Sequence, residues 1–453
     1  MKVILKRKNQ ILFAAISSIL SATVGLNVAN ASGAYKEIES VLDHSGFVVG
    51  AWANGGVTYN GNEPSDNFNG PVTFGDRASE FQLNQLNVFI QRAVATEGDK
   101  WDFGGRFDFM YGTDSIFTQA YGVPSLDVDT QLSQQRSDWD LSMLGSNSNR
   151  FYDIALPQAY LESYVPVGNG LNLKVGHFYT PIGYETVPAP DNFFYTHAYT
   201  MQYGEPFTHT GVMGNYTVDD NWAVMGGLVT GSATGGWDGG WDRQLGNWSG
   251  LMGATYTTTD KATSLNIAGT YGDTSETSSA PWALYSVVLK HNINEKTHLV
   301  LQHDHGFADK TYDFATGTPN SLDAEWYGIN SHLYYDVSDT VVVGVRAEWF
   351  RDQNGLRVCS PGRIGAATDN QGVSYAAAGS YLSTCAPATY YEFTAGVTWK
   401  PKEWLRLRPN IRYDIVGDSH GYSPFVVHGN PGQPGSTTVT DQITFSTDFT
   451  VTF

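Results

Sequence analysis

Residues 442–453 read QITFSTDFTVTF. Every second residue from Ile443 to Phe453 is apolar except Thr447, and the residues between them are all polar. A β-strand points successive side chains to opposite faces, so a period of two gives each face its own composition. The stretch therefore predicts a strand with one face against an apolar medium and the other against water.

The same alternation recurs along the chain. Between Trp101 and Tyr111, aromatic residues alternate mainly with polar and charged ones, and 341–349, 391–399 and 404–413 behave alike. We predict sixteen strands, near 46–53, 80–94, 101–110, 154–165, 170–179, 207–217, 221–229, 249–257, 262–271, 281–290, 296–304, 324–335, 340–350, 389–399, 403–413 and 440–453.

The connections between these strands alternate in length. Every second one is short, as at 96–100 and 166–170, and those between are long, as at 54–79 and 351–388. Soluble β-sandwiches also alternate in polarity, but short periplasmic turns and long outer loops are typical of outer-membrane barrels. We predict an all-β fold, a transmembrane antiparallel up-and-down β-barrel of about sixteen strands with long extracellular loops.

Charged residues decide which face of the strands meets lipid. Arg406, Arg408 and Arg412 share one face, and an Arg or Lys near the bilayer midplane costs about 2–4 kcal/mol on the lipid side. They must line the lumen, which in a barrel of this size is an aqueous channel unless it is plugged. The expected pore-lining residues are Arg106, Asp108, Lys174, Arg346, Glu348, Glu392, Arg406, Arg408 and Arg412.

The N-terminal residues predict export. Basic residues from Lys2 to Lys8 precede an apolar run at 11–20 and the small residues 29–31, as in a secretory signal peptide. We expect a signal peptide at 1–31, a short periplasmic segment at 32–45 and the barrel at 46–453, integral to the outer membrane of a Gram-negative-type bacterium. Without residues 1–31 the chain keeps 22 basic and 45 acidic residues, a net charge of −23 that excludes nucleic acid as a partner.

One segment carries a family resemblance. It reads VGHFYTPIGYE at 175–185, PAPDNFFY at 188–195 and GEPFTHTGV at 204–212. It resembles the OmpL-like β-barrel outer-membrane porins, and the similarity covers most of the mature chain, although only this segment is a specific signature. The resemblance implies a porin without naming its solute. The alternating aromatics that end at Phe453 are similar to the signal read by the barrel-assembly machinery.

The signature segment includes the connection between the fifth and sixth predicted strands, 181–206. In sixteen-stranded porins this connection folds into the lumen and narrows it. Here it holds Glu185, Asp191 and Glu205 and no Lys or Arg. We expect a constriction loop whose acids face the inward arginines across the pore and set a transverse field. The alternatives are that it covers the rim, or that loop 111–153 narrows the pore instead.

Two other groups of residues suggest local sites. Cys359 and Cys385 lie in one long outer loop of an exported protein, so we expect a disulfide between them. His303 and His305 share a strand face beside Asp304, as metal ligands can, but no third and fourth ligand can be named. We therefore expect no metal and no cofactor.

Sequence motifs help to separate an enzyme, a porin and an adhesin. The sequence lacks G-x-S-x-G and H-E-x-x-H and offers no convincing catalytic triad, so we expect no enzyme. We expect a porin and ion channel that passes ions and small hydrophilic solutes by passive diffusion, surrounded by outer-membrane lipid and lipopolysaccharide. The alternative is a surface-exposed adhesin or structural barrel. Trp237, Trp241 and Trp248 in one outer loop could stack on sugars or anchor at the membrane interface. Ion selectivity and association into a homo-oligomer stay open.

Overall fold

The computed structural model describes residues 46–64, 67, 69–115, 118, 125–126, 133–134, 152–230, 248–273, 281–313, 318–358, 387–419, 423–425 and 439–453. Its described helical segments are two short turns, η2 (Ala189–Asp191) and η3 (Thr200–Gly204). No helix among these residues is long and apolar enough to cross a membrane.

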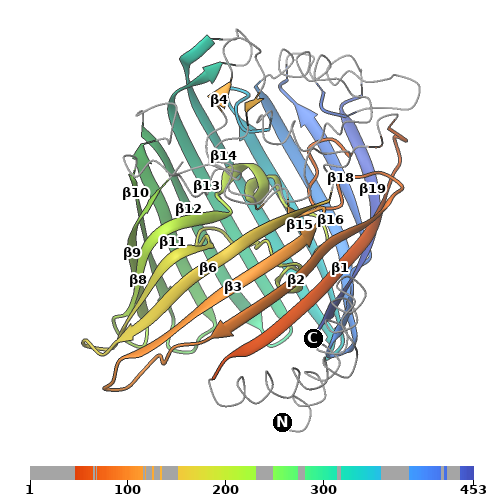
Figure 1. Ribbon diagram of the computed structural model, residues 1–453. Helices are drawn as coiled ribbons and strands as arrows, with labels where there is room; N and C mark the ends of the chain where they lie inside the picture. The colour runs from red at the N-terminus through yellow and green to blue at the C-terminus, as the bar shows by residue number, and fades with distance from the viewer. Residues whose placement is uncertain are drawn as a thin grey trace, which may run out of the picture.

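The strands form a closed antiparallel barrel (Figure 1). Each strand pairs with the next barrel strand in sequence, and β1 pairs with β19 to close the sheet. β17 and β18 are successive parts of one barrel strand, so the predicted sixteen strands are confirmed. The bounds are β1 Val48–Asn60, β2 Phe81–Arg92, β3 Asp102–Gly112, β6 Asp153–Val165, β7 Leu171–Tyr179, β8 Thr208–Thr217, β9 Trp222–Thr230, β10 Trp248–Thr257, β11 Thr263–Asp273, β12 Pro281–Asn294, β13 Thr297–Asp313, β14 Thr318–Ser338, β15 Val341–Asp352, β16 Ala388–Lys402, β17 Leu405–Leu407, β18 Asn410–Gly417 and β19 Asp441–Thr452. A separate two-stranded sheet joins β4 (Ser125–Leu126) to β5 (Ser133–Gln134).

The prediction that the first strand ends near residue 53 is wrong. β1 continues to Asn60 and stays paired with β19 as far as the Asn60–Thr444 pair. Gly55 and Gly56 lie inside this longer strand, where Gly56 allows close packing. A Cβ on Gly56 would lie 2.8 Å from the Tyr195 ring, so the glycine lets that ring lie against the strand.

The prediction that 305–323 is a loop is also wrong. β13 runs on to Asp313 and β14 begins at Thr318, with pairing retained up to Asp313 and Thr318 and two irregularities on the way. Both strands are longer than the roughly 9–11 residues that cross a membrane, so they extend beyond it.

Pro409 interrupts the barrel strand predicted at 403–413. Proline has no N–H to give to a ladder, and in a sheet it is confined to edges, bulges and strand starts. The neighbouring bonds survive: the Pro409 carbonyl accepts from the Val397 N–H at 3.0 Å, and the Arg408 N–H donates to Asp448 O at 3.0 Å. The break therefore leaves the register intact and separates β17 from β18.

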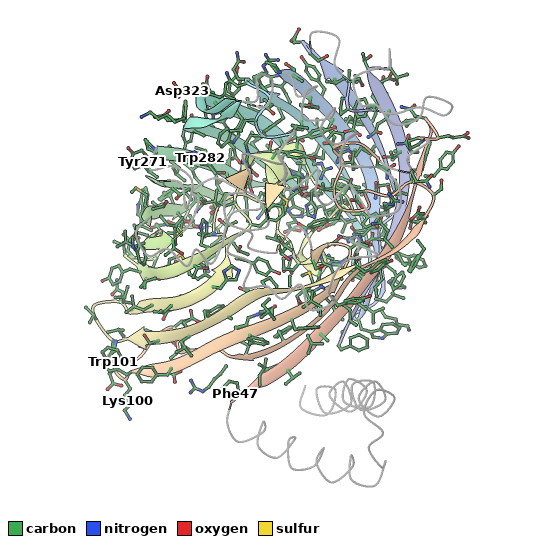
Figure 2. The ribbon with its side chains drawn as sticks, turned by 45° about the horizontal axis from the view of Figure 1, so that its top comes forward. Phe47, Lys100, Trp101, Tyr271, Trp282 and Asp323 are labelled. Atoms are coloured by element: carbon green, nitrogen blue, oxygen red, sulfur yellow. The ribbon has the colours of Figure 1, made fainter. Side chains whose placement is uncertain are left out.

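Burial confirms the predicted faces of β19. Thr444, Ser446 and Asp448 are buried, whereas the Phe445 side chain between them is 48% exposed. Outward aromatic side chains gather toward both ends of the barrel, and Figure 2 shows Trp101 at the end with the short turns and Tyr271 toward the opposite end. Two aromatic girdles around an apolar band are what an outer-membrane barrel presents to lipid.

Candidate functional site

The residues 180–207, which we call the inner loop, join β7 to β8 and lie inside the barrel (Figure 1). Its base is closed by a hydrogen bond from the Thr180 N–H to the Phe207 carbonyl at 3.0 Å. Side chains such as Phe194, Tyr199 and Tyr203 are almost completely buried. The loop bonds to β2 and to strands from β13 to β18, so it crosses from the β7 wall to the far wall.

Arg346 of β15 holds the inner loop at two points. Its side chain is fully buried and donates to Glu185 Oε1 at 2.6 Å and to the Thr196 carbonyl at 2.9 Å. The same guanidinium pairs with Glu392 Oε2 of β16 at 3.0 Å. One cation therefore ties together two strands and two points of the loop.

Arg408 makes the densest set of loop contacts. Its Nη1 donates to the carbonyls of Ala189, Asn192 and Phe194 at 3.0, 2.9 and 2.9 Å. Its Nε lies 2.9 Å from Asp448 Oδ1 of β19. The Arg408 charge is thus paired, and its spare donors satisfy backbone groups of the loop that would otherwise be buried without partners. 

Arg406 and Arg412 hold further loop carbonyls. Arg406 donates to the carbonyls of Pro190 and Asn192. Arg412 pairs with Asp414 at 2.8 Å and donates to the His197 carbonyl at 2.5 Å. All three arginines that the sequence placed on the lumen side therefore reach the inner loop.

Acidic wall residues hold the loop through its N–H groups. Glu348 of β15 accepts from the backbone N–H groups of Tyr199 and Thr200, both at 2.6 Å. The Tyr199 hydroxyl donates to Asp414 Oδ1 at 2.7 Å. These bonds fix the start of η3, where several N–H groups lack partners within the turn.

The three acids of the inner loop have different surroundings. Burial acts to raise the pKa of Glu185, but the Arg346 charge and the hydrogen bond from His197 hold that pKa well below its usual range. Burial and the neighbouring Asp304 carboxylate raise the pKa of Glu205 well above its usual range, and the Gln302 amide donates to its carboxylate. Asp191 is exposed.

The remaining predicted residues lie nearer to β7. Arg106 pairs with Asp108 within β3, with Nη2 to Oδ2 at 2.8 Å, and its guanidinium lies 4.1 Å from the centroid of the Phe89 ring. Lys174 of β7 lies 4.2 Å from the Tyr160 ring centroid and is paired in register with Glu162. Arg106 is therefore paired within the wall, and Lys174 lies against an aromatic ring with an acidic residue as its register partner.

The structure differs from the sequence in how charges are arranged. From the sequence we expected acids and arginines to face each other across an open constriction. Instead Arg346 bonds directly to Glu185, while Arg408 and Arg412 pair with wall acids and with loop carbonyls. The loop packs against the arginine-bearing wall, so the charges that we expected to face each other across the pore are in direct contact.

Neutral amides also position the inner loop, and sequence reasoning missed them. Gln85 of β2 donates to the Val187 carbonyl at 2.8 Å and accepts from the Ala189 N–H at 3.0 Å. Gln302 of β13 accepts from the Tyr184 N–H at 3.1 Å. The sequence did offer a signal: four of the six residues from Gln82 to Asn87 are Asn or Gln, a density of amides that a strand lining open water does not require.

A buried aromatic cluster inside the barrel was missed as well. Trp326 is fully buried and its indole N–H donates to the Gly204 carbonyl at 3.1 Å. Trp282, labelled in Figure 2, and Phe350 belong to the same cluster with Tyr199 and Tyr203 of the loop. We expected an aqueous lumen, which predicts polar side chains at inward positions, so the sequence did not point to this cluster.

A cavity of about 300 Å³ lies on the other side of the lumen, along the inner wall from β7 to β11. Asn172, Asn215, Asn266, Thr217 and Thr255 supply most of its polar groups. Its complete lining is Thr96, Gly170, Asn172, Pro181, Asn215, Tyr216, Thr217, Ala223, Val224, Met225, Gly253, Ala254, Thr255 and Asn266.

The predicted cysteine pair, the second candidate constriction loop and the histidine pair are not among the described residues that form this site. Cys359, Cys385 and most of loop 111–153 lie outside the described residues. His303 bonds to the Gly328 carbonyl and His305 to Glu325, and both contact the outward Tyr285 ring. Among the described residues, no group of three or more His, Cys, Asp or Glu could hold a metal ion.

Solved porins share this architecture. OmpT of Vibrio cholerae superposes with a TM-score of 0.52 at 12% identity, over 90% of this chain and 97% of that one. The anion-selective porin from Comamonas acidovorans gives 0.53 at 8% identity, over 90% and 99%. OprB of Pseudomonas putida gives 0.53 at 11% identity, over 92% and 97%. At these identities the likeness shows the fold alone.

Sequence comparison places the chain in a family. None of the curated proteins matches it. The family model described as "Putative beta-barrel porin-2, OmpL-like" matches residues 46–453, which include every strand of the barrel. The resemblance seen in residues 175–212 is therefore confirmed over the whole barrel. This chain belongs to the OmpL-like β-barrel porin family and is an integral porin of the outer membrane.

Proposed function

We propose that ions and small hydrophilic solutes cross this barrel by passive diffusion, and that the inner loop sets its narrowest part. One observation carries the proposal: buried Arg346, Arg408 and Arg412 bind backbone carbonyls of a loop that crosses from the β7 wall to the far wall. A loop fixed in this way occupies part of the cross-section and leaves the remainder, next to β7–β11, as the route. The proposed channel has no catalytic role.

Solute flux through reconstituted protein tests the proposal. We expect vesicles that hold the purified chain to swell in isotonic solutions of small neutral sugars at a rate that falls with sugar size. Arg346→Ala removes the bonds to Glu185 and to the Thr196 carbonyl, so the loop loosens and larger sugars enter faster.

Arg351→Ala is the matched control for Arg346→Ala. Arg351 lies on the same strand but bonds to Gln353 and Thr389 rather than to the inner loop. We expect its size dependence to equal that of the unchanged chain. If folded Arg346→Ala and Arg351→Ala both behaved like the unchanged chain, the inner loop would not set the size limit.

An adhesin or structural barrel is the competing function. It needs no open route, so vesicles with well-folded protein would not swell for any solute. The described wall beside β7–β11 favours the channel, because a cavity of about 300 Å³ lies along it.

The proposal also covers export, assembly and the outer loops. We propose removal of residues 1–31 on export, a short periplasmic segment at 32–45, and a disulfide between Cys359 and Cys385 that closes an outer loop. We also propose assembly through the C-terminal strand, contact with lipopolysaccharide, and association of several copies, as in the structure of Vibrio cholerae OmpT described as a trimer form. Thiol labelling of denatured, unreduced protein tests the disulfide, which should leave no thiol to label.

A further inference from the structure

Three buried arginines of the lumen lie on one side of it. Arg346, Arg408 and Arg412 lie on the wall from β15 to β18, are 0–1% exposed, and are each paired with a carboxylate. Glu348, on the same wall, is buried against loop N–H groups. Each arginine and its carboxylate partner have opposite charges close together, so their fields largely cancel at the distance of a solute on the other side of the lumen.

The cavity wall from β7 to β11 has the opposite character. None of the residues that line the cavity is Asp, Glu, Lys, Arg or His. Asn215 of β8 is exposed to the lumen, and Asn266 of β11 donates to Thr255 Oγ1 at 2.8 Å. Met225 and Gly253 form apolar patches between these groups.

The amides offer both hydrogen-bond donors and acceptors. An Asn side chain presents two N–H donors and a carbonyl acceptor, and a Thr hydroxyl can act in either role. The Asn172 Oδ1 atom is buried and has no hydrogen-bond partner in the described part of the chain. The cavity wall can therefore exchange bonds with water, hydroxyl groups or amides without a fixed charge.

The nearest basic side chains, on β7 and β12, stay outside the cavity lining. Lys290 of β12 faces inward, and its ammonium lies 5.1 Å from the ring centroid of Tyr184 in the inner loop. Lys174 is the next inward residue after Asn172, but its ammonium lies over the Tyr160 ring and opposite Glu162. On the turn between β10 and β11, Asp260 accepts from the Thr258 hydroxyl and the Ala262 N–H, at the barrel end rather than in the cavity lining.

We infer that the permeation route follows the β7–β11 wall and favours uncharged solutes rich in hydroxyl or amide groups, with little preference between cations and anions. The inference rests on the proposed channel function and names its solute class. The cavity volume is at the lower end of small-molecule sites, so it suits a solute of sugar or polyol size. The arginines hold the inner loop and do not set ion selectivity.

Reversal potentials of the purified full chain in a planar bilayer under a KCl gradient test the inference. We expect the unchanged chain to give a permeability ratio of K⁺ to Cl⁻ within about twofold of one. Asn215→Asp should shift the ratio toward K⁺ and Asn215→Lys toward Cl⁻, each by about fivefold, the effect of a unit charge about 8 Å away in a partly aqueous lumen.

Thr259→Asp is the control for added charge, because Thr259 is exposed on the turn after β10 and does not line the cavity. Its expected ratio equals that of the unchanged chain. In parallel, vesicles should take up sorbitol faster than gluconate, which has a similar size and a negative charge.

The outcomes separate the inference from the proposed function. Absence of conductance from folded protein would overturn both. Conductance with a ratio beyond about tenfold, or with Asn215→Asp and Asn215→Lys both equal to the unchanged chain, would leave the channel standing and overturn the uncharged route. Equal shifts from Thr259→Asp and Asn215→Asp would also overturn it, since the charge would then act at the mouth.

Discussion

Arg408→Ala should destabilise the protein by several kcal/mol, since Arg408 is 1% exposed and serves both the wall and the inner loop. The substitution leaves the Asp448 carboxylate buried with the Asn54 amide, 2.6 Å away, as a remaining donor. It also removes the donor shared by the carbonyls of Ala189, Asn192 and Phe194. Removing one partner of a buried ion pair costs about 3–5 kcal/mol.

Loop carbonyls can regain water from the lumen, so the stranded carboxylate dominates the cost. About 3 kcal/mol is the lower bound, which lowers the ratio of folded to unfolded protein by roughly a hundredfold. Urea unfolding of protein folded into lipid vesicles, followed by tryptophan fluorescence, measures this change as a shift of the midpoint at constant slope.

The double variant Arg408→Ala with Asp448→Asn is the matched comparison. It removes both charges, and replacing a whole buried pair often costs little. We expect it to recover about 2 kcal/mol relative to Arg408→Ala, a coupling that a double-mutant cycle isolates. A free energy of unfolding for Arg408→Ala within about 0.5 kcal/mol of the unchanged chain would refute the reasoning.

Three further predictions follow from single contacts. Gly306→Ala would place a Cβ 2.1 Å from the Trp326 ring, so the same urea titration should show a loss of about 1–3 kcal/mol, and an unchanged midpoint would contradict the close packing. Folding raises the pKa of Glu205, so the contribution of this carboxyl to the free energy of unfolding is complete below its unfolded pKa of about 4.3 and is lost as pH rises through the folded pKa. Glu205→Gln should flatten the pH dependence of the free energy of unfolding, and an equal pH dependence for both proteins would contradict the raised pKa. Spin labels at Phe445 and Asn215, in a chain with Cys359 and Cys385 replaced by Ser, should be accessible to oxygen in lipid and to a water-soluble nickel complex respectively, and the reverse result would overturn the assignment of faces.

Much of the fold could be predicted because lipid and water act on alternate residues. In β19, Thr444, Ser446, Asp448 and Thr450 face inward and Phe445 faces outward, as the period of two requires. Strand ends were less predictable. Gly56 lies in β1 beyond its predicted end, and its packing depends on the ring of the distant Tyr195, which sequence periodicity does not register.

The candidate site was predictable in its residues but not in its contacts. The costs of charge in lipid placed Arg346, Arg408 and Arg412 inside the barrel, where the structure also has them. Their partners depend on where the inner loop packs, which is a tertiary property. The interior position of Trp326 was missed for the same reason, since the loop excludes water from a place where an open lumen would hold it.

Single-channel recording tests the central claim that this barrel is an open porin narrowed by its inner loop. We predict stepwise, stable conductance increases when the purified chain inserts into a planar bilayer, with larger steps for Arg346→Ala than for Arg351→Ala because Arg346 holds the loop. Folded protein that inserts without conductance steps would contradict the open lumen, and equal steps for both variants would contradict the loop as its constriction.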